Sequence, residues 1–222
     1  MDIEWTGGTG IVHLGDGINA FETSFVDELH AALDVVAANA DARALVTVGG
    51  GRHYSDGFDI DFLTSLEGPD LVTFMGRTLG ALARLLTFPV PAVAAINGHA
   101  FGVGAMLALA HDRRAMREDR GWFCLPEIDL GMQFSPFMLA LILDRLPRPV
   151  VDEAVLTGRR YGGKDALAGG IVHATAAVED LIAAATTLAE PMMGKGRDIT
   201  VAHKRALHAP VLDQLPDAAR AE

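Results

Sequence analysis

The segment from Phe88 to Ala110 contains no Asp, Glu, Lys or Arg, and it constrains the fold of this chain more than any other feature. An apolar segment of this length could form a transmembrane helix. Residues that favour turns interrupt it, however, at Pro89, Pro91, Asn97, Gly98, Gly102 and Gly104. The segment therefore predicts a buried strand over Ala92–Ile96, a turn, and a buried helix from about Val103 to His111, with no membrane contact.

Short apolar runs alternate with helical patterns through the rest of the sequence. Gly10–Leu14 and Ala44–Val48 contain β-branched residues and are each followed by glycine, so both predict strands. Apolar residues from Phe25 to Val36 recur at helical spacing after Thr23 or Ser24, either of which suits an N-cap. Further helices are expected over Leu71–Leu86, Phe137–Leu146, Val150–Leu156, Leu181–Leu188 and Val201–Leu207. This alternation predicts an α/β fold with a largely parallel sheet.

Length and charge narrow the class of protein. At 222 residues, half of them hydrophobic, the chain is long enough for one domain with a full core and a small appendage. Its 18 basic and 29 acidic side chains give a net charge of −11, which disfavours binding to nucleic acid or to an anionic membrane. A local basic patch could still bind an anionic small molecule.

Two features bear on the compartment in which the protein works. Cys124 is the single cysteine, so no internal disulfide can form and a reducing compartment is expected. The segment from Met1 to Trp5 has neither a basic region nor an apolar run, which predicts no signal peptide. We therefore expect a cytoplasmic protein.

Two glycine-containing segments follow predicted strands. In Gly49–Ile60, Gly57 permits a tight turn that would leave the Phe58 amide free to donate a hydrogen bond, although an ordinary loop is the default interpretation. In Asn97–Gly104, glycines let the chain bend from a strand into a helix whose first amides lack intrahelical acceptors. Close packing of the helix on the strand would explain the same glycines. Neither segment has the signature of a phosphate-binding P-loop or a dinucleotide-binding loop.

Glu127 lies in the largely apolar segment Leu125–Gly131, directly after a proline. An isolated Glu is usually solvated or ion-paired, but burial in a dry pocket would raise its pKa and suit it to proton transfer. Asp129 competes for this role, because an extended segment would place both carboxylates on the same side. The local sequence does not separate the two.

These three segments resemble, in order and spacing, the enoyl-CoA hydratase/isomerase family, also called the crotonase superfamily. Ala44–Val48 with Ser55–Ile60 is similar to the family's first oxyanion strand and adenine-binding loop, and Ala94–Gly104 to its second oxyanion segment. Pro126–Gly131 resembles the segment that bears its carboxylate, and Asp165–Val172 its passage from helix to strand before the C-terminal region.

The resemblance extends from about residue 11 to residue 172 and implies a crotonase-like spiral of β-β-α units. It divides the chain into a core that binds acyl-CoA, residues 1–175, and a C-terminal helical trimerisation region, residues 176–222. An acyl-CoA thioester is the implied partner, and a homotrimer or a dimer of trimers is the implied assembly. Coenzyme A would enter as part of the substrate, with no separate cofactor. No cluster of His, Cys and Asp has the spacing of a metal site.

The resemblance also implies roles for individual residues. The amides of Phe58 and Val103 would hold the thioester oxygen, and Glu127 would move the proton. Val103 stands where the family often has glycine, which is compatible with a role for its backbone N–H. Asp59 and Ile60 fall on the loop that usually lines the CoA adenine site.

Met106 stands at the helix position where hydratases of this family usually carry a second glutamate, and methionine cannot transfer a proton. The resemblance therefore implies an isomerase that shifts the double bond of a 3-enoyl-CoA to position 2, with Glu127 as its proton shuttle. Met132–Phe137 resembles the apolar segment of monofunctional isomerases, so Met106 and Phe137 are expected to shape the acyl pocket; helix-start packing explains Phe137 equally well. A hydratase or other enolate-forming acyl-CoA enzyme and a non-catalytic acyl-CoA-binding paralogue stay open as alternatives.

A basic cluster stands apart from these motifs. It could approach CoA phosphates or a neighbouring subunit, but a solvated face is the simpler interpretation. The cluster consists of Arg113, Arg114, Arg117 and Arg120. Lys204 and Arg205 are further candidates for contact with CoA phosphates.

Overall fold

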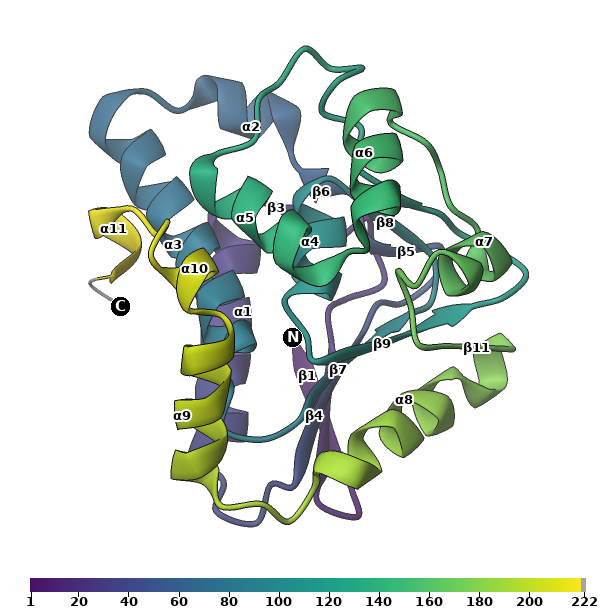
Figure 1. The fold of residues 1–222 in the computed structure, drawn as a ribbon. Coiled ribbons are helices and arrows are strands. Elements are labelled where there is room, and N and C mark those ends of the chain that lie inside the picture. The colour runs from purple at the N-terminus through teal and green to yellow at the C-terminus, as the bar shows by residue number, and fades with distance from the viewer. Residues whose placement is uncertain (221–222) are drawn as a thin grey trace.

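The computed structural model describes residues 1–220, and within this range the chain forms a mixed α/β structure with three sheets (Figure 1). The strands are β1 (Asp2–Thr6), β2 (Thr9–His13), β3 (Ala20–Phe21), β4 (Ala44–Val48), β5 (His53–Ser55), β6 (Gly57–Phe58), β7 (Ala92–Ile96), β8 (His99–Phe101), β9 (Arg113–Arg117), β10 (Phe123–Cys124) and β11 (Ala174–Ala176). The helices are α1 (Thr23–Ala38), α2 (Ile60–Ser65), α3 (Gly68–Leu86), α4 (Val103–Leu109), α5 (Pro136–Arg145), α6 (Arg148–Thr157), α7 (Gly163–Ala168), α8 (Leu181–Ala189), α9 (Arg197–Leu207), α10 (Ala209–Leu212) and α11 (Asp217–Arg220). Short 3₁₀ turns cover Val178–Asp180 and Glu190–Met192.

The large sheet has the strand order β1-β2-β4-β7-β9-β11 within the described residues. β1 is antiparallel to β2, and the other neighbours are parallel. Every residue of β4 and β7 is buried, as their continuous apolar sequences predict for central strands covered on both faces. The predicted α/β fold with a largely parallel sheet is therefore confirmed. Within residues 1–220, no helix is both long and apolar enough to cross a bilayer.

Helices cover both faces of the large sheet. On one face, α8 packs Leu181 and Ala185 against Val46 and Val93, and Figure 1 shows this helix lying across the strands. On the other face, Leu45 belongs to the main core that α1, α3 and α4 build. Successive residues of β4 thus point to opposite cores, which follows from the two-residue period of a strand.

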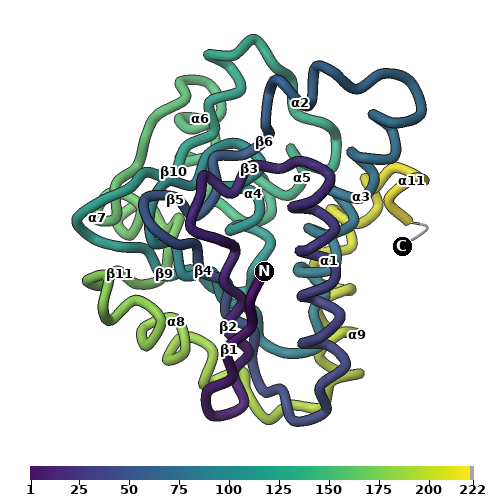
Figure 2. The backbone as a smooth tube through the Cα atoms, turned by 180° about the vertical axis from the view of Figure 1, so that it is seen from behind, coloured from purple at the N-terminus to yellow at the C-terminus, as the bar shows by residue number. Residues whose placement is uncertain are grey.

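The C-terminal helices pack on the core of their own chain. Seen from behind in Figure 2, α9 runs beside α1, and α11 lies next to α3. Arg197 of α9 donates hydrogen bonds to the carbonyls of Ala37 and Ala42, and Val211 and Ala219 join the main core. The division at residue 175 and the role of these helices in trimer assembly stay predictions, and residues 221–222 lie outside the described residues.

The differences from the predicted elements are local. α1 begins at Thr23 with Glu22 as its N-cap, without a side-chain capping bond, so neither Thr23 nor Ser24 is the cap. Helix α2 and the short strands of the two smaller sheets were not predicted, because segments of two to six residues carry too little periodicity. These short elements surround the turns that form the candidate site.

A hydrogen-bonded network joins the large sheet to the small sheet β10-β8-β5. Thr47 Oγ1 lies 2.7 Å from the Tyr54 hydroxyl and 2.9 Å from His111 Nε2, and all three side chains are fully buried. Burial lowers the pKa of His111 to about 3, so the ring is neutral. Because its Nδ1 donates to the Leu107 carbonyl at 2.8 Å, Nε2 accepts from Thr47, which in turn accepts from Tyr54.

We expect Tyr54→Phe to lower the free energy of unfolding by about 1–2 kcal/mol, because it removes a buried donor from this chain of hydrogen bonds. Tyr161→Phe is the matched control: its hydroxyl donates to Glu153, whose side chain is 41% exposed, and its loss should cost less than about 1 kcal/mol. Urea denaturation of both variants measures the difference. Equal losses would contradict a special role for the buried network.

Candidate active site

Two glycine turns bring the short strand β6 against the start of α4. Gly57 has φ +90°, and a Cβ atom added there would lie 2.7 Å from the Phe101 carbonyl oxygen and 3.5 Å from the Val103 nitrogen. Gly102 has φ +51° and ψ −125°, a conformation that side chains disfavour. Glycine at both positions therefore lets two segments far apart in the sequence meet backbone to backbone.

Within residues 1–220, the backbone N–H groups of Phe58 and Val103 donate to no backbone carbonyl. Asp59 donates its N–H to the Phe21 carbonyl of β3 at 3.2 Å. Successive amides of a strand point in opposite directions, so the Phe58 N–H points away from β3. Within residues 1–220, β6 pairs with no other strand. Val103 is the first residue of α4, ahead of the first intrahelical bond from Met106 to Gly102.

A tight turn positions Glu127 over the Gly102 bend. β10 pairs in parallel with β8, and the Gly102 N–H donates to the Cys124 carbonyl at 3.0 Å, so the following residues lie beside the start of α4. The Asp129 N–H then bonds to Pro126 and the Met132 N–H to Glu127, both at 2.9 Å. The extended conformation considered for this segment is therefore wrong, because these backbone bonds fold it into a turn.

The turn separates the two candidate carboxylates. Glu127 is 8% exposed, and a Cβ atom added at Gly102 would lie 3.3 Å from its Oε1. Asp129 is exposed instead, and its Oδ2 would lie 2.6 Å from a Cβ atom added at Gly158. Glu127 alone of the two lines the cavity beside the Gly57 and Gly102 turns.

Burial sets the electrostatics of Glu127. Loss of contact with water raises its pKa from 4.5 to about 7, and its own backbone N–H only partly offsets this rise. Within the described residues, Oε2 has no hydrogen-bond partner although it is fully enclosed. A carboxyl group in this state can take up or release a proton near neutral pH, and it has a free oxygen for a ligand.

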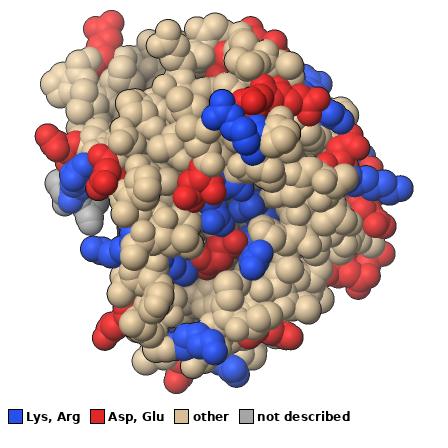
Figure 3. Space-filling model, viewed as in Figure 1, with Lys and Arg blue, Asp and Glu red and all other residues tan. Residues whose placement is uncertain are grey.

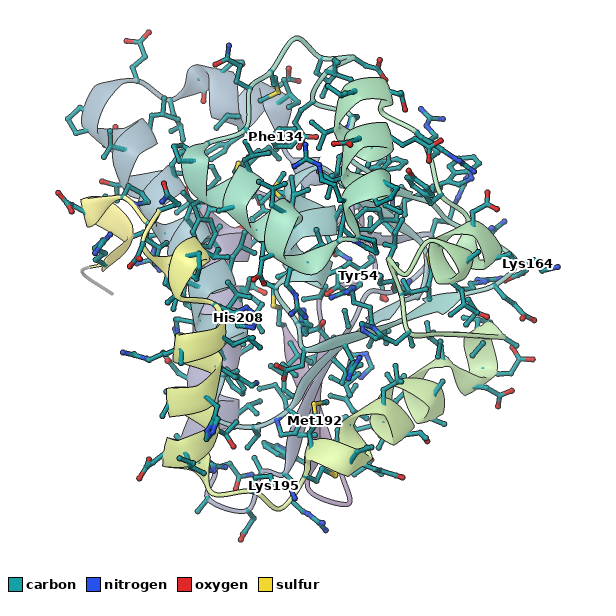
Figure 4. The ribbon with its side chains drawn as sticks, viewed as in Figure 1. Tyr54, Phe134, Lys164, Met192, Lys195 and His208 are labelled. Carbon is teal, nitrogen blue, oxygen red and sulfur yellow. The ribbon has the colours of Figure 1, made fainter. Side chains whose placement is uncertain are left out.

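A cavity of about 290 Å³ connects these groups, and most of its wall is apolar. It is lined by Asp56, Gly57, Phe58, Ile60, Leu63, Met75, Gly102, Val103, Pro126, Glu127, Leu130, Met132, Gln133, Phe134, Ser135 and Met138. Phe134, labelled in Figure 4, marks its position at the α2 and α5 side of the molecule. An apolar cavity with a few convergent polar groups is typical of a small-molecule site.

The structure brings part of the predicted site together. Phe58, Val103, Glu127 and Ile60 all line the cavity. Asp59 is one residue away, where its side chain caps α2 by accepting from the Phe62 N–H at 2.9 Å.

Two predicted acyl-pocket residues lie behind the cavity wall. Met106 is 1% exposed within α4, and Phe137 is fully buried in the main core. Neither is among the lining residues. Contact between substrate and Asp59, Met106 or Phe137 stays a prediction.

The cavity also contains residues that sequence reasoning missed. Asp56 lines it, with Oδ1 2.7 Å from His53 Nδ1. Leu63 and Met75 reach it from α2 and α3. The pattern of α3 identifies Met75 as part of an apolar face, but it cannot say that this face ends at a cavity.

The basic cluster is a solvated face only in part, because Arg113 and Arg120 are exposed whereas Arg114 is buried. Arg114 is 2% exposed, and its Nε donates to the Ile171 carbonyl at 2.6 Å, because β9 is an inner strand of the large sheet. Arg117 pairs with Asp119. Lys204 is held by Asp112 at 2.6 Å, away from the residues that line the candidate site.

Comparison with known proteins finds a family model described as enoyl-CoA hydratase/isomerase that matches residues 10–222. A relative described as enoyl-CoA delta isomerase 3 of Arabidopsis thaliana is 34% identical over 158 residues, which are 68% of this chain and 66% of the relative. A carnitinyl-CoA dehydratase of Salmonella enteritidis PT4 is 33% identical over 150 residues, 68% of this chain and 57% of the relative. The chain thus spans about two thirds of the first relative and less of the second.

A solved structure supports the same comparison over nearly the whole chain. It is described as a probable enoyl-CoA hydratase from Mycobacterium tuberculosis H37Rv. The two share 29% sequence identity and a TM-score of 0.88, with 99% of this chain and 91% of that chain covered.

We expect Glu127→Gln to stabilise the protein at pH 8 by about 2–3 kcal/mol, and to lose this advantage as the pH falls to 4.5. The folded pKa is above the unfolded one, so the folded state holds a proton that the unfolded state releases between pH 4.5 and 7. Wild-type stability therefore falls as the pH rises through that window. Urea denaturation at pH 5 and pH 8 measures the change, with the exposed Glu190→Gln as control. A difference independent of pH would contradict the raised pKa.

Proposed function

Because the chain belongs to the enoyl-CoA hydratase/isomerase family, the crotonase superfamily that its motifs resemble, we propose that it is an enoyl-CoA isomerase converting 3-enoyl-CoA into 2-enoyl-CoA. One observation carries the proposal. Glu127 is a buried carboxyl with a raised pKa and an unbonded oxygen, placed beside two backbone amides in a largely apolar cavity. This arrangement suits a reaction that moves one proton and needs no added water.

The two amides would form an oxyanion hole. In the proposed complex, the thioester oxygen accepts hydrogen bonds from the N–H groups of Phe58 and Val103, and the acyl chain lies against Leu63, Met75 and Phe134. Backbone amides held by a rigid fold are already oriented toward the developing charge, so they need little reorganisation during the reaction. Each such donor contributes roughly 3–4 kcal/mol to the stabilisation of a transition state.

Glu127 would then carry the proton between two carbons. Its carboxylate removes a proton from C2, and the electron pair moves through C1 to the thioester oxygen, giving a dienolate. The protonated Glu127 returns the same proton to C4 as the electrons shift back, which leaves the double bond between C2 and C3. Atoms and charge balance without a metal or redox cofactor, and coenzyme A enters as part of the substrate.

The buried Met106 supports an isomerase over a hydratase. A hydratase must position water as well as transfer a proton, and methionine at this point of α4 does neither. The adenine end of coenzyme A would lie along the loop of Asp59 and Ile60. Assembly into a trimer or a dimer of trimers, and a cytoplasmic location, remain parts of the proposal.

One observation favours a second candidate, a hydratase or dehydratase. Asp56 is another carboxylate on the cavity wall, and it could orient water while Glu127 protonates carbon. Similarity to a carnitinyl-CoA dehydratase supports this alternative. Asp56 is already paired with His53, so it is less free to act as an acid or base than Glu127.

We expect Glu127→Gln to lower the rate of isomerisation 10²–10⁴-fold, because it removes the proton-transfer group. Asp56→Asn should keep the rate within about tenfold. The assay follows conjugated 2-enoyl thioester and hydrated product separately from a 3-enoyl-CoA. The wild-type kcat/KM should rise with pH toward a plateau above about 7, where Glu127 is ionised.

Two results would contradict this assignment. Hydration that needs both carboxylates would favour the hydratase. Binding of acyl-CoA without turnover, unchanged in Glu127→Gln, would favour a non-catalytic paralogue.

A second test removes the backbone N–H of Val103, one of the two proposed oxyanion donors, and leaves Glu127 in place. Proline is well tolerated at the first position of a helix, so Val103→Pro deletes the N–H with little cost to α4. We expect kcat to fall by about 10²–10³-fold. Val103→Ala keeps the N–H and should stay within about tenfold of the wild type. Similar losses in both variants would mean that the side chain, rather than the amide, matters at this position.

A further inference from the structure

A second cavity of about 520 Å³ lies at the other end of α5 from the acyl site. It is lined by Asp112, Arg113, Arg114, Asp144, Arg145, Leu146, Pro147, Gly170, His173, Met192, Lys204, Leu207 and His208. In Figure 4, His208 and Met192 mark two of its sides. The two cavities share no lining residue. On α5, Met138 lines the first cavity and Asp144 the second, six residues or about 9 Å apart along the helix.

Positive charge dominates this second cavity. Three arginines and Lys204 face two carboxylates, and Figure 3 shows blue groups recessed between red ones near the centre of this face. Both carboxylates are already engaged: Asp112 binds Lys204 at 2.6 Å, and Asp144 binds His208 at 2.8 Å. Within residues 1–220, no carboxylate forms an ion pair with Arg113, Arg114 or Arg145.

Two of these arginines converge on one point. Arg114 Nη1 and Arg145 Nη2 both donate to the His111 carbonyl oxygen, at 3.3 and 2.7 Å. Their guanidinium groups therefore lie within reach of a single small ligand. Arg114 Nη2 has no acceptor in the described part of the chain.

Carbonyl oxygens accept some of the hydrogen bonds of Arg114 and Arg145 but do not neutralise their charge. Burying a cation without a counter-charge is costly. Burial, together with the nearby Arg145 and Arg113, lowers the pKa of Arg114 to about 9. Burial also lowers the pKa of Arg145 and Lys204. An anion in the cavity would relieve this repulsion.

We propose that this cavity binds a small multivalent oxyanion of the phosphate type. Planar guanidinium groups match the tetrahedral oxygens of phosphate with paired hydrogen bonds. His173 adds a neutral donor, because its Nδ1 accepts from the Arg114 N–H at 3.1 Å and its Nε2 therefore carries the proton. The site is independent of the proposed isomerase function, since it is built from residues outside the acyl cavity.

The test is calorimetric titration of the full chain with inorganic phosphate at constant ionic strength, without acyl-CoA. We expect saturable binding of one phosphate per chain in the wild type. Arg113→Gln removes an exposed cation from the cavity wall with little effect on folding, and should weaken binding by about tenfold. Lys164→Gln removes the same charge from α7, where Lys164 points outward at the far edge of Figure 4, and should leave the affinity unchanged.

A third arm separates free phosphate from the phosphates of coenzyme A. Saturating coenzyme A should leave the affinity for phosphate unchanged, and Glu127→Gln should bind phosphate as the wild type does. The proposal is overturned by an absence of saturable binding, by equal affinity in Arg113→Gln and the wild type, or by competition from coenzyme A. None of these readouts depends on isomerase activity, so failure here and failure of the proposed function are distinguishable.

Discussion

The close approach of the Gly57 turn to the backbone at Phe101–Val103 is the contact on which the candidate active site depends. A side chain at residue 57 would collide with the Phe101 carbonyl oxygen and hold the two segments apart. Among the described residues, the backbone N–H groups of Phe58 and Val103 at this contact have no backbone acceptor. Unbonded amides near a protein interior are costly, so their presence beside a cavity is best understood as preparation for a ligand.

In the same region, the buried carboxyl group of Glu127 also lowers the stability of the folded protein. Its burial against apolar residues makes ionisation unfavourable and leaves Oε2 without a partner among the described residues. A solvated glutamate would stabilise the fold more at neutral pH but would be a weaker base. The fold therefore gives up stability and holds a carboxyl group whose pKa of about 7 suits proton transfer near neutral pH.

Elsewhere in the protein, buried polar groups offset the loss of contact with water in two different ways. The Thr47, Tyr54 and His111 side chains satisfy one another and are uncharged, so they can tie two sheets together at little electrostatic cost. Arg114 and Arg145 donate to carbonyl oxygens, which leave their positive charges without a counter-charge. The uncharged side chains therefore form a structural network, whereas the charged arginines line a cavity that is suited to an anion.

The sequence by itself determined the central elements and most of the site's polar groups. Ala44–Val48 and Ala92–Ile96 are strands as predicted, because a continuous apolar run between turn residues is suited to a central parallel strand. Glycine spacing and family resemblance identified Phe58, Val103 and Glu127, all of which line the cavity. These are local signals, readable from a few neighbouring residues.

The local sequence does not separate Glu127 from Asp129, and the tertiary structure does, because the turn between them depends on bonds that β8 and β10 position. The tertiary structure also places Met106 and Phe137 outside the cavity lining and Asp56 within it. Of the arginines of β9, Arg114 is buried for the same reason, whereas Arg113 stays exposed. Which side of a strand or helix meets a cavity is set by partners distant in the sequence, and no local pattern encodes that choice.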